Sequence, residues 1–281
     1  MTGAREAGPP AAPDAQAIVA SEVTYSGGLR LDLILNAQFP HLGAHDEMLF
    51  IVIHQASELW MKLMLHELAA ADRHLAAGTV RPALKMLARI KRVQEQLTQS
   101  WNVLSTMTPV DFLAFRHALG ASSGFESFQY REIEFRLGYK RGDFLDIYRR
   151  DPATHGRLKA ALEAPSIYDR VLMLLAKAGH ALPAEVVKRD WSKPYVPHPA
   201  VEEAWKAVYR RPEASWELYE LAESLLDISD RFQHWRHAHA TAVERVIGMK
   251  PGTGGSAGVP YLRRALDHRF FPELWSMRTA L

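Results

Sequence analysis

The chain has 281 residues, of which 48% are hydrophobic and 23% are charged, a composition typical of a globular protein with a sizeable core. Its 34 basic and 32 acidic residues leave a net charge of +2. This small charge excludes a strong electrostatic field that would attract nucleic acid or an anionic membrane. It has no cysteine, which excludes disulfides, thiolate chemistry, iron–sulfur clusters and cysteine-ligated metals.

The N-terminal region predicts little regular structure. Residues 1–20 are rich in Ala, Pro and Gly, which predicts a disordered tail, and they lack the apolar core of a signal peptide. Residues 24–29 predict a short extended piece and a turn. A brief helix is then expected over 30–38, with its Leu and Ile side chains facing inward.

A long helical pattern over residues 46–77 begins with acidic residues and ends before Gly78. Its first half is apolar nearly all round, so we expect that part to be deeply buried. Its longest strongly apolar run, residues 48–53, is far shorter than the ~20 residues that span a bilayer, so we expect a cytoplasmic protein with no membrane span. His54 is the one strongly polar ring in the run, and either a hydrogen-bonded core residue or a functional group fits that position.

A second amphipathic helix is expected over residues 81–107, and another begins at Thr108-Pro109-Val110-Asp111, which has the form of an N-cap, an N1 proline and an acidic N3. On that helix Phe112 and Arg116 share a face among apolar neighbours. A buried guanidinium needs an anionic partner, whereas one that reaches solvent does not. The pattern therefore leaves both a binding role and a surface role open for Arg116.

The rest of the chain predicts further helices and no strand, because no segment alternates between polar and apolar residues. In chain order these are a helix over 127–137, short helices within 141–180, an irregular stretch over 181–200, a long helix over 212–247 and a C-terminal helical piece broken at Pro272. We predict one all-α domain over residues 21–281.

Three histidines lie close together in the long helix, and helical geometry separates them. Because an α-helix turns about 100° per residue, His239 shares an apolar stripe with Phe232 and Trp235, whereas His237 and His234 point elsewhere. The alternative for His239 is a core histidine with satisfied ring nitrogens. The glycine-rich loop that follows, with Thr253 and Ser256, offers backbone and hydroxyl groups to a polar ligand.

Several catalytic motifs are absent from the sequence. There is no Glu-x-x-His pair of a di-iron bundle, no H-E-x-x-H zinc motif, no P-loop and no G-x-S-x-G elbow. A single inward histidine without companion ligands suits a haem, whose porphyrin supplies the other four iron ligands.

Long motifs, in order along the chain, resemble the tryptophan 2,3-dioxygenase family over nearly the whole length after the tail. They are YSGGLRLD from Tyr25, HDEMLFIVIHQASELWMK from His45, TPVDFLAFR from Thr108, SSGFESFQYREIEF from Ser122 and FQHWRHAHATAVERVIGMKPGTGGSAGV from Phe232. The resemblance implies a homotetramer of helical subunits, each with one haem b.

The resemblance also implies roles for individual residues. It makes His239 the proximal haem ligand, His54 the distal catalytic residue, and Arg116 and Thr253 contacts of the amino acid. The implied indole pocket is formed by the run Phe50, Ile51, Val52, Ile53 and His54, together with Phe112, while Tyr25 and Leu29 reach a neighbouring subunit's site. Two positions depart from the family pattern: Phe112 stands where some members have tyrosine, and His237 stands where an aromatic residue is expected.

The expected reaction is cleavage of the indole 2,3-bond of L-tryptophan by O2 to N-formylkynurenine, the first step of the kynurenine pathway. The sequence also leaves open a non-catalytic haem sensor, a structural helical oligomer and a dioxygenase of broader indoleamine specificity. Haem absorption, catalytic turnover and a comparison of L-tryptophan with tryptamine separate these alternatives.

Overall fold

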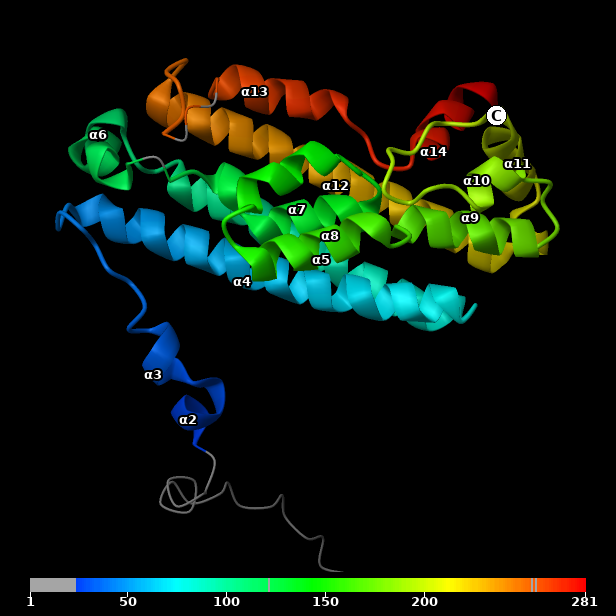
Figure 1. Cartoon of the computed structure of the whole chain (residues 1–281), viewed down its shortest axis with the longest axis horizontal. Helices are drawn as coiled ribbons and strands as arrows, with labels where there is room; N and C mark the ends of the chain where they lie inside the picture. The colour runs from blue at the N-terminus through cyan, green and yellow to red at the C-terminus, as the bar shows by residue number, and fades with distance from the viewer. Residues whose placement is uncertain (1–23, 121, 254, 256) are drawn as a thin grey trace, which may run out of the picture. The chain divides into compact units, whose positions relative to one another are not determined.

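The computed structural model describes residues 24–120, 122–253, 255 and 257–281, so the predicted disordered tail and Ser256 lie outside the described residues. The structure is 74% helical, and the described residues contain no strand, which confirms the all-α prediction. Two compact units divide the chain, residues 1–40 and residues 41–281. The larger unit contains the long helices drawn in Figure 1.

The described part of the smaller unit contains two short helices, α2 (Tyr25–Leu29) and α3 (Leu31–Ile34). The extended piece predicted here is wrong, because Thr24 caps α2 by accepting a hydrogen bond from the Gly27 amide at 3.1 Å. The prediction that the Leu and Ile side chains of the second helix face inward is also wrong, since neither helix contains a buried residue. These apolar side chains have no core of their own.

Three long helices form the scaffold of the larger unit: α4 (His45–Ala76), α5 (Val80–Leu104) and α12 (Trp216–Ile247). Both α4 and α12 pack against α5, and the three run side by side in Figure 1. The predicted bounds of the first two helices differ from the observed ones by at most three residues. Their interlocking apolar stripes form the main core.

Shorter helices cover this scaffold. They are α6 (Pro109–Phe115), α7 (Phe128–Leu137), α8 (Pro152–Glu163), α9 (Ile167–Lys177), α10 (Ala184–Val187), α11 (Pro199–Arg210), α13 (Val259–Arg264) and α14 (Pro272–Ser276). Short 3₁₀ helices occupy Arg116–Leu119, Gly124–Glu126, Gly142–Tyr148, Pro212–Ala214, Ala265–Asp267 and Met277–Ala280. The predicted start of α6 is confirmed, because Thr108 and Asp111 form a reciprocal capping box before Pro109.

Three predictions about the C-terminal half are wrong. The stretch predicted as irregular contains α10, and α11 was not predicted although it buries Val201, Trp205 and Val208 on one face. The long helix begins at Trp216, because Pro212 starts a separate 3₁₀ turn. Pro272 begins α14 instead of breaking a helix, since proline fits the first helical turn.

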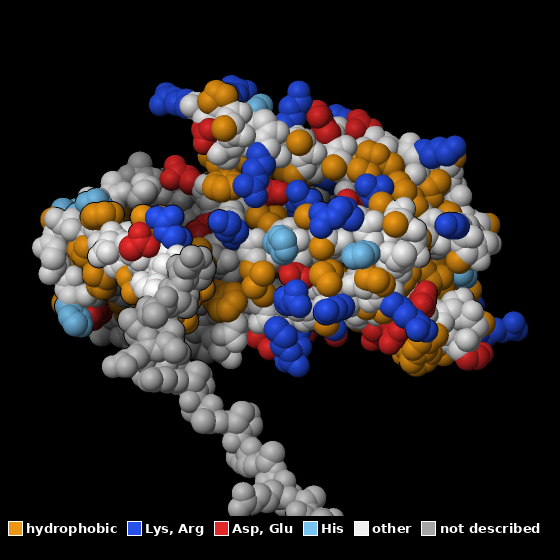
Figure 2. Space-filling model, turned by 90° about the horizontal axis from the view of Figure 1, so that it is seen from below, with side chains coloured by type: hydrophobic (Ala, Val, Ile, Leu, Met, Phe, Trp, Pro, Cys, Tyr) orange, Lys and Arg blue, Asp and Glu red, His pale blue; other side chains and the backbone are white. Residues whose placement is uncertain are grey.

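The first half of α4 is not deeply buried, contrary to prediction. Met48, Val52 and Leu59 are 42%, 44% and 51% exposed, whereas the buried residues of α4 lie mostly in its second half. Figure 2 views the molecule from the side on which α4 lies in Figure 1, and orange hydrophobic side chains lie there among charged ones. This exposed apolar face is the consequence of an all-round apolar helix that has neighbours on only part of its circumference.

The helix α4 is also long and apolar enough to meet a simple criterion for a membrane span. That criterion is weak evidence, because core helices of soluble proteins also meet it. The absence of a membrane span therefore stays a prediction.

Candidate functional site

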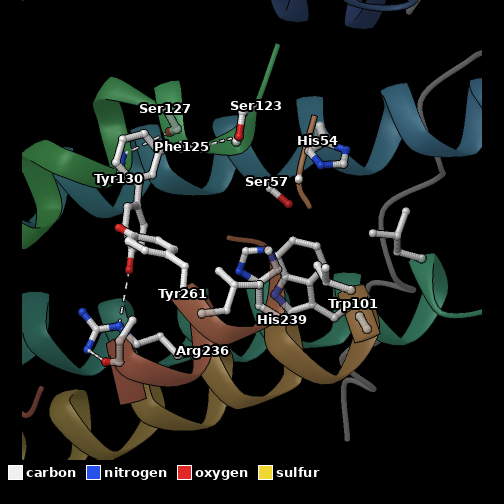
Figure 3. A pocket seen from close by; sticks show the side chains of 18 of the residues that line it. His54, Ser57, Trp101, Ser123, Phe125, Ser127, Tyr130, Arg236, His239 and Tyr261 are labelled. Carbon is white, nitrogen blue, oxygen red and sulfur yellow. Dashed lines mark hydrogen bonds between the residues drawn. The ribbon is translucent and has the colours of Figure 1, made fainter. Parts of the chain in front are cut away.

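A cavity of about 570 Å³ opens between α4, α5, α6, α7, α12 and α13. This volume lies within the roughly 300–1,000 Å³ typical of small-molecule and cofactor sites. The cavity wall includes six residues that the sequence singled out: Phe50, His54, Phe112, Arg116, His239 and Thr253. Figure 3 shows His54 on α4 and His239 on α12 on opposite walls.

The hydrogen bond made by His54 defines which of its nitrogens faces the cavity. Its Nδ1 lies 2.7 Å from the carbonyl oxygen of Phe50, and because a carbonyl only accepts, Nδ1 carries the proton. Burial lowers the pKa of His54, although the Phe50 carbonyl and Glu58 partly oppose that shift. The ring is therefore neutral at pH 7, and its Nε2 lone pair is free to accept a hydrogen bond from a ligand.

His239 presents a neutral imidazole from the opposite wall. Its ring stacks on Trp101 with centroids 4.3 Å apart and planes 9° apart. Among the described residues neither ring nitrogen has a hydrogen-bond partner, and burial, with a smaller contribution from His54, lowers the pKa of His239 to about 4. His237 and His234 are exposed, so the structure places only His239 of the three on the cavity wall.

Arg116 and Thr253 lie where two loops meet at the rim of the cavity. Arg116 Nη2 donates to the Pro251 carbonyl at 2.6 Å, and Thr253 Oγ1 donates to the Ser122 carbonyl at 2.6 Å. The two hydrogen bonds connect the segment after α6 to the loop after α12. A cation and a hydroxyl thus stand together at the rim, each held by a neutral carbonyl that a ligand carboxylate can replace.

Gly258 allows the loop after α12 to turn back on itself. Its φ is +66°, and a Cβ there would lie 2.5 Å from the Lys250 carbonyl oxygen, so only glycine fits. The glycine-rich composition noted in the sequence thus has a steric cause at this position.

The structure does not bring all the predicted pocket residues together. Ile51, Val52 and Ile53 are absent from the cavity wall, because residues four apart share a helical face and consecutive residues do not. Ile53 is instead buried in the hydrophobic cluster beside the cavity, and Val52 is exposed. Tyr25 and Leu29 are exposed residues of the smaller unit.

Sequence reasoning missed several polar groups on the cavity wall. Four buried nitrogens of wall residues lack hydrogen-bond partners in the described part of the chain: Trp101 Nε1, Trp235 Nε1, Arg131 Nε and His268 Nε2. Buried polar atoms are normally paired, so their concentration at one cavity indicates a ligand site. The sequence signal for Trp235 was its place on the apolar stripe of His239, which also fits simple core packing.

The residues that the structure describes do not form a site for a metal ion without a cofactor. No group of three His, Cys, Asp or Glu side chains there is arranged to hold one. A metal ligated by His239 would therefore need most of its ligands from a cofactor.

Three histidines on the wall make the stability of the ligand-free protein depend on pH. Burial lowers the pKa of His54, and it lowers those of His239 and His268 to about 4. Since an unfolded histidine has a pKa of about 6.5, the unfolded chain takes up protons that the folded chain does not. The contribution of these three neutral histidines to the free energy of unfolding is therefore fully present above pH 6.5 and is lost as the pH falls towards 4.

We expect His239→Phe to reduce this pH dependence, because phenylalanine keeps a ring against Trp101 but does not titrate. The measurement is the thermal midpoint of the ligand-free protein from pH 7 to 4.5. His237→Phe, which replaces an exposed ring, should behave as wild type. An unchanged pH dependence in His239→Phe would contradict the conclusion that burial lowers the pKa of His239.

The chain is similar to known proteins over nearly all its length. A sequence model of the tryptophan 2,3-dioxygenase family matches residues 12–154 and 206–281. A tryptophan 2,3-dioxygenase of Polaromonas sp. is 54% identical over 95% of this chain and 91% of its own length. An enzyme of the same name from Burkholderia pseudomallei is 54% identical over 95% of this chain and 87% of its own length. Another from Bacillus cereus is 53% identical over 92% of this chain and 93% of its own length. The chain belongs to the tryptophan 2,3-dioxygenase family.

Proposed function

We propose that this chain binds one haem b at its cavity and cleaves the indole 2,3-bond of L-tryptophan with O2, giving N-formylkynurenine. The dioxygenase activity follows from family membership, and it makes the chain an oxidoreductase of tryptophan catabolism. The observation that carries the proposal is the pair of neutral histidines, His54 and His239, on opposite walls of one cavity.

The residues of the cavity fit a haem. His239 offers an unprotonated nitrogen without a competing hydrogen bond, and it would hold the haem iron. The described residues supply no second and third ligand, and a porphyrin supplies four. When bound, the haem supplies the iron chemistry that activates O2, while the protein positions the substrate.

His54 orients the indole in this proposal. Its Nε2 accepts the indole N–H, because Nδ1 is already committed to the Phe50 carbonyl. The rings of Phe50 and Phe112 pack with centroids 6.1 Å apart and provide an apolar wall for the indole. An indole N–H is a weak acid, so holding it in place is a sufficient role for His54.

Arg116 and Thr253 bind the polar end of the amino acid. Arg116 exchanges the Pro251 carbonyl for the substrate carboxylate, a stronger partner because both groups are charged. Thr253 exchanges the Ser122 carbonyl for the carboxylate and ammonium of the substrate. Phe112 is buried and cannot donate a hydrogen bond, so Arg116 carries more of the carboxylate contact than in relatives with tyrosine there.

A homotetramer explains the exposed apolar faces. The α4 face of Met48, Val52 and Leu59 needs a protein partner, as do Tyr25 and Leu29 in the smaller unit. Another copy of this chain provides both, with Tyr25 and Leu29 contributing to a neighbouring site. The small net charge fits a cytoplasmic protein with no nucleic acid or membrane partner.

Replacing His239 with Ala should abolish haem retention, because iron loses its only protein ligand. His237→Ala is the matched control and should keep the haem, since that ring lies on the exposed side of α12. The measurement is the haem Soret band after reconstitution and gel filtration, with and without L-tryptophan. The opposite pattern in the two variants would refute the ligand assignment.

Replacing Arg116 with Ala should raise KM for L-tryptophan by about tenfold to a hundredfold, the equivalent of one lost charge-assisted hydrogen bond. Tryptamine lacks the carboxylate, so its already poor kcat/KM should change little in the same variant. Steady-state kinetics with both substrates test this. Equal losses for the two substrates would show that Arg116 does not bind the carboxylate.

Sedimentation analysis should give a tetramer for the wild type. Replacing both Val52 and Leu59 with Glu should produce smaller species, because charges would be buried in the proposed interface. Lys85→Glu, at an exposed position of α5, is the control and should remain tetrameric. A monomeric wild type would contradict the proposed assembly.

A further inference from the structure

Three charged side chains form a buried cluster at the cavity, and their charges do not cancel. Arg131 Nη1 donates to Glu134 Oε2 at 2.7 Å, and Arg236 Nη2 donates to Glu134 Oε1 at 2.9 Å. All three side chains are 5% exposed or less. Two guanidinium groups share one carboxylate, so the cluster has one uncompensated positive charge, and all three residues border the cavity.

The neighbouring groups satisfy Arg236 with neutral acceptors. Its Nη1 donates to the carbonyls of Ala265 and His268 at 3.2 and 2.8 Å, and its Nε donates to the Tyr130 hydroxyl at 3.3 Å, the bond drawn in Figure 3. Tyr130 does not supply the missing negative charge, because burial raises the pKa of its phenol well above the usual value. Arg236 thus has partners for each of its nitrogens, but none of them adds an anion beyond Glu134.

Arg131 is the member with unused hydrogen-bonding capacity. Its Nε is buried and has no partner within the described residues. Its guanidinium lies between aromatic rings, 4.7 Å from the Phe125 centroid and 4.1 Å from that of Phe144. Cation–π contacts reduce the cost of burying this charge but do not neutralise it. A buried cation with a free donor on a cavity wall indicates an anionic ligand.

The anion is a different one from the substrate carboxylate assigned to Arg116. Arg116 binds the Pro251 carbonyl in the loop after α12, whereas Arg131 and Arg236 bind Glu134 of α7. The two groups of cations have no hydrogen-bond partner in common among the described residues. The haem assigned to the cavity itself has two carboxylates on one edge.

We propose that Arg131 binds a carboxylate of the haem, so that the Arg131–Glu134–Arg236 cluster positions the carboxylate edge of the cofactor in the cavity. This inference rests on the proposed haem binding. The bound carboxylate completes a cluster of two cations and two anions. Haem binding and charge balance of the subunit core are thereby coupled.

The test combines a change in the protein with a change in the cofactor. Full-length protein is reconstituted with haem and with haem dimethyl ester, whose carboxylates are neutral, and loss to an excess of a haem-scavenging globin is followed by absorbance. Wild type should lose the ester about tenfold to a hundredfold faster than haem, the equivalent of one charge-assisted hydrogen bond. Arg131→Met should lose both at nearly the same rate.

Arg136→Met is the matched control. Arg136 is on the same helix and pairs with the buried Glu132, but it does not border the cavity. This variant should discriminate between haem and its ester as wild type does. Equal discrimination by Arg131→Met and wild type, with the Soret band retained, would overturn the inference while leaving the proposed haem site intact. No Soret band with either porphyrin in wild type would overturn both.

Thermal unfolding separates a haem-binding role from a structural one. Arg131→Met leaves a balanced Glu134–Arg236 pair, so the haem-free variant should unfold no more than a few degrees below wild type. The increase in midpoint caused by haem should be smaller in the variant, because the lost interaction is made only with the cofactor. A large loss in the haem-free protein with an undiminished haem effect would show a structural role.

A free anion is the remaining alternative occupant. Inorganic phosphate and chloride are added to the haem-free wild type and to Arg131→Met at constant ionic strength. Stabilisation by either anion that is specific to Arg131 and undiminished when haem is bound would assign the site to a small anion and overturn the proposal. We expect any such stabilisation to disappear in the haem-bound protein.

Discussion

The indole of Trp101 contacts both histidines of the site. It stacks on His239, and its plane is nearly perpendicular to that of His54, whose ring centroid is 6.4 Å away. Trp101 is on α5, the helix against which both α4 and α12 pack. The separation of the two imidazoles is therefore set by one helix and one large rigid side chain. Any change that shifts α5 alters both walls of the cavity together.

The site combines rigid walls with a rim that depends on two exchangeable hydrogen bonds. His54 and His239 project from long helices that are anchored in the main core. Arg116 instead begins the 3₁₀ segment after α6, and Thr253 lies in the loop after α12. Arg116 donates to the Pro251 carbonyl, and Thr253 donates to the Ser122 carbonyl. Neutral carbonyls are weaker partners for an arginine than a carboxylate is. A ligand with a carboxylate thus competes directly for the groups that hold the rim closed.

The cavity also accounts for features that would be costly in a protein without ligands. Unpaired buried nitrogens and an uncompensated guanidinium destabilise a folded chain. Here these groups belong to residues that line one cavity. The exposed apolar face of α4, on the outside of the subunit, is also unfavourable in water. Both features fit the proposed function. The proposed cofactor and the proposed assembly would stabilise α4 from its two sides.

The sequence by itself determined the long helices, the capping box at Thr108 and the choice of His239 over its two neighbours, because helical period and capping are local properties. Its motifs also determined the family, which the comparisons confirm. It placed five consecutive residues in the indole pocket, although only Phe50 and His54 border the cavity. A linear motif does not state which face of a helix it uses.

Only the tertiary structure decided which distant groups meet. Arg131 and Glu134 lie one turn apart on α7, but nothing local predicts that Arg236, 102 residues after Glu134, binds the same carboxylate. The tautomer of His54 and the bonds that hold Arg116 and Thr253 likewise depend on where backbone carbonyls fall after packing. Burial of α4 was overestimated for the same reason, since apolar composition measures what a helix can bury and its neighbours determine what it does bury.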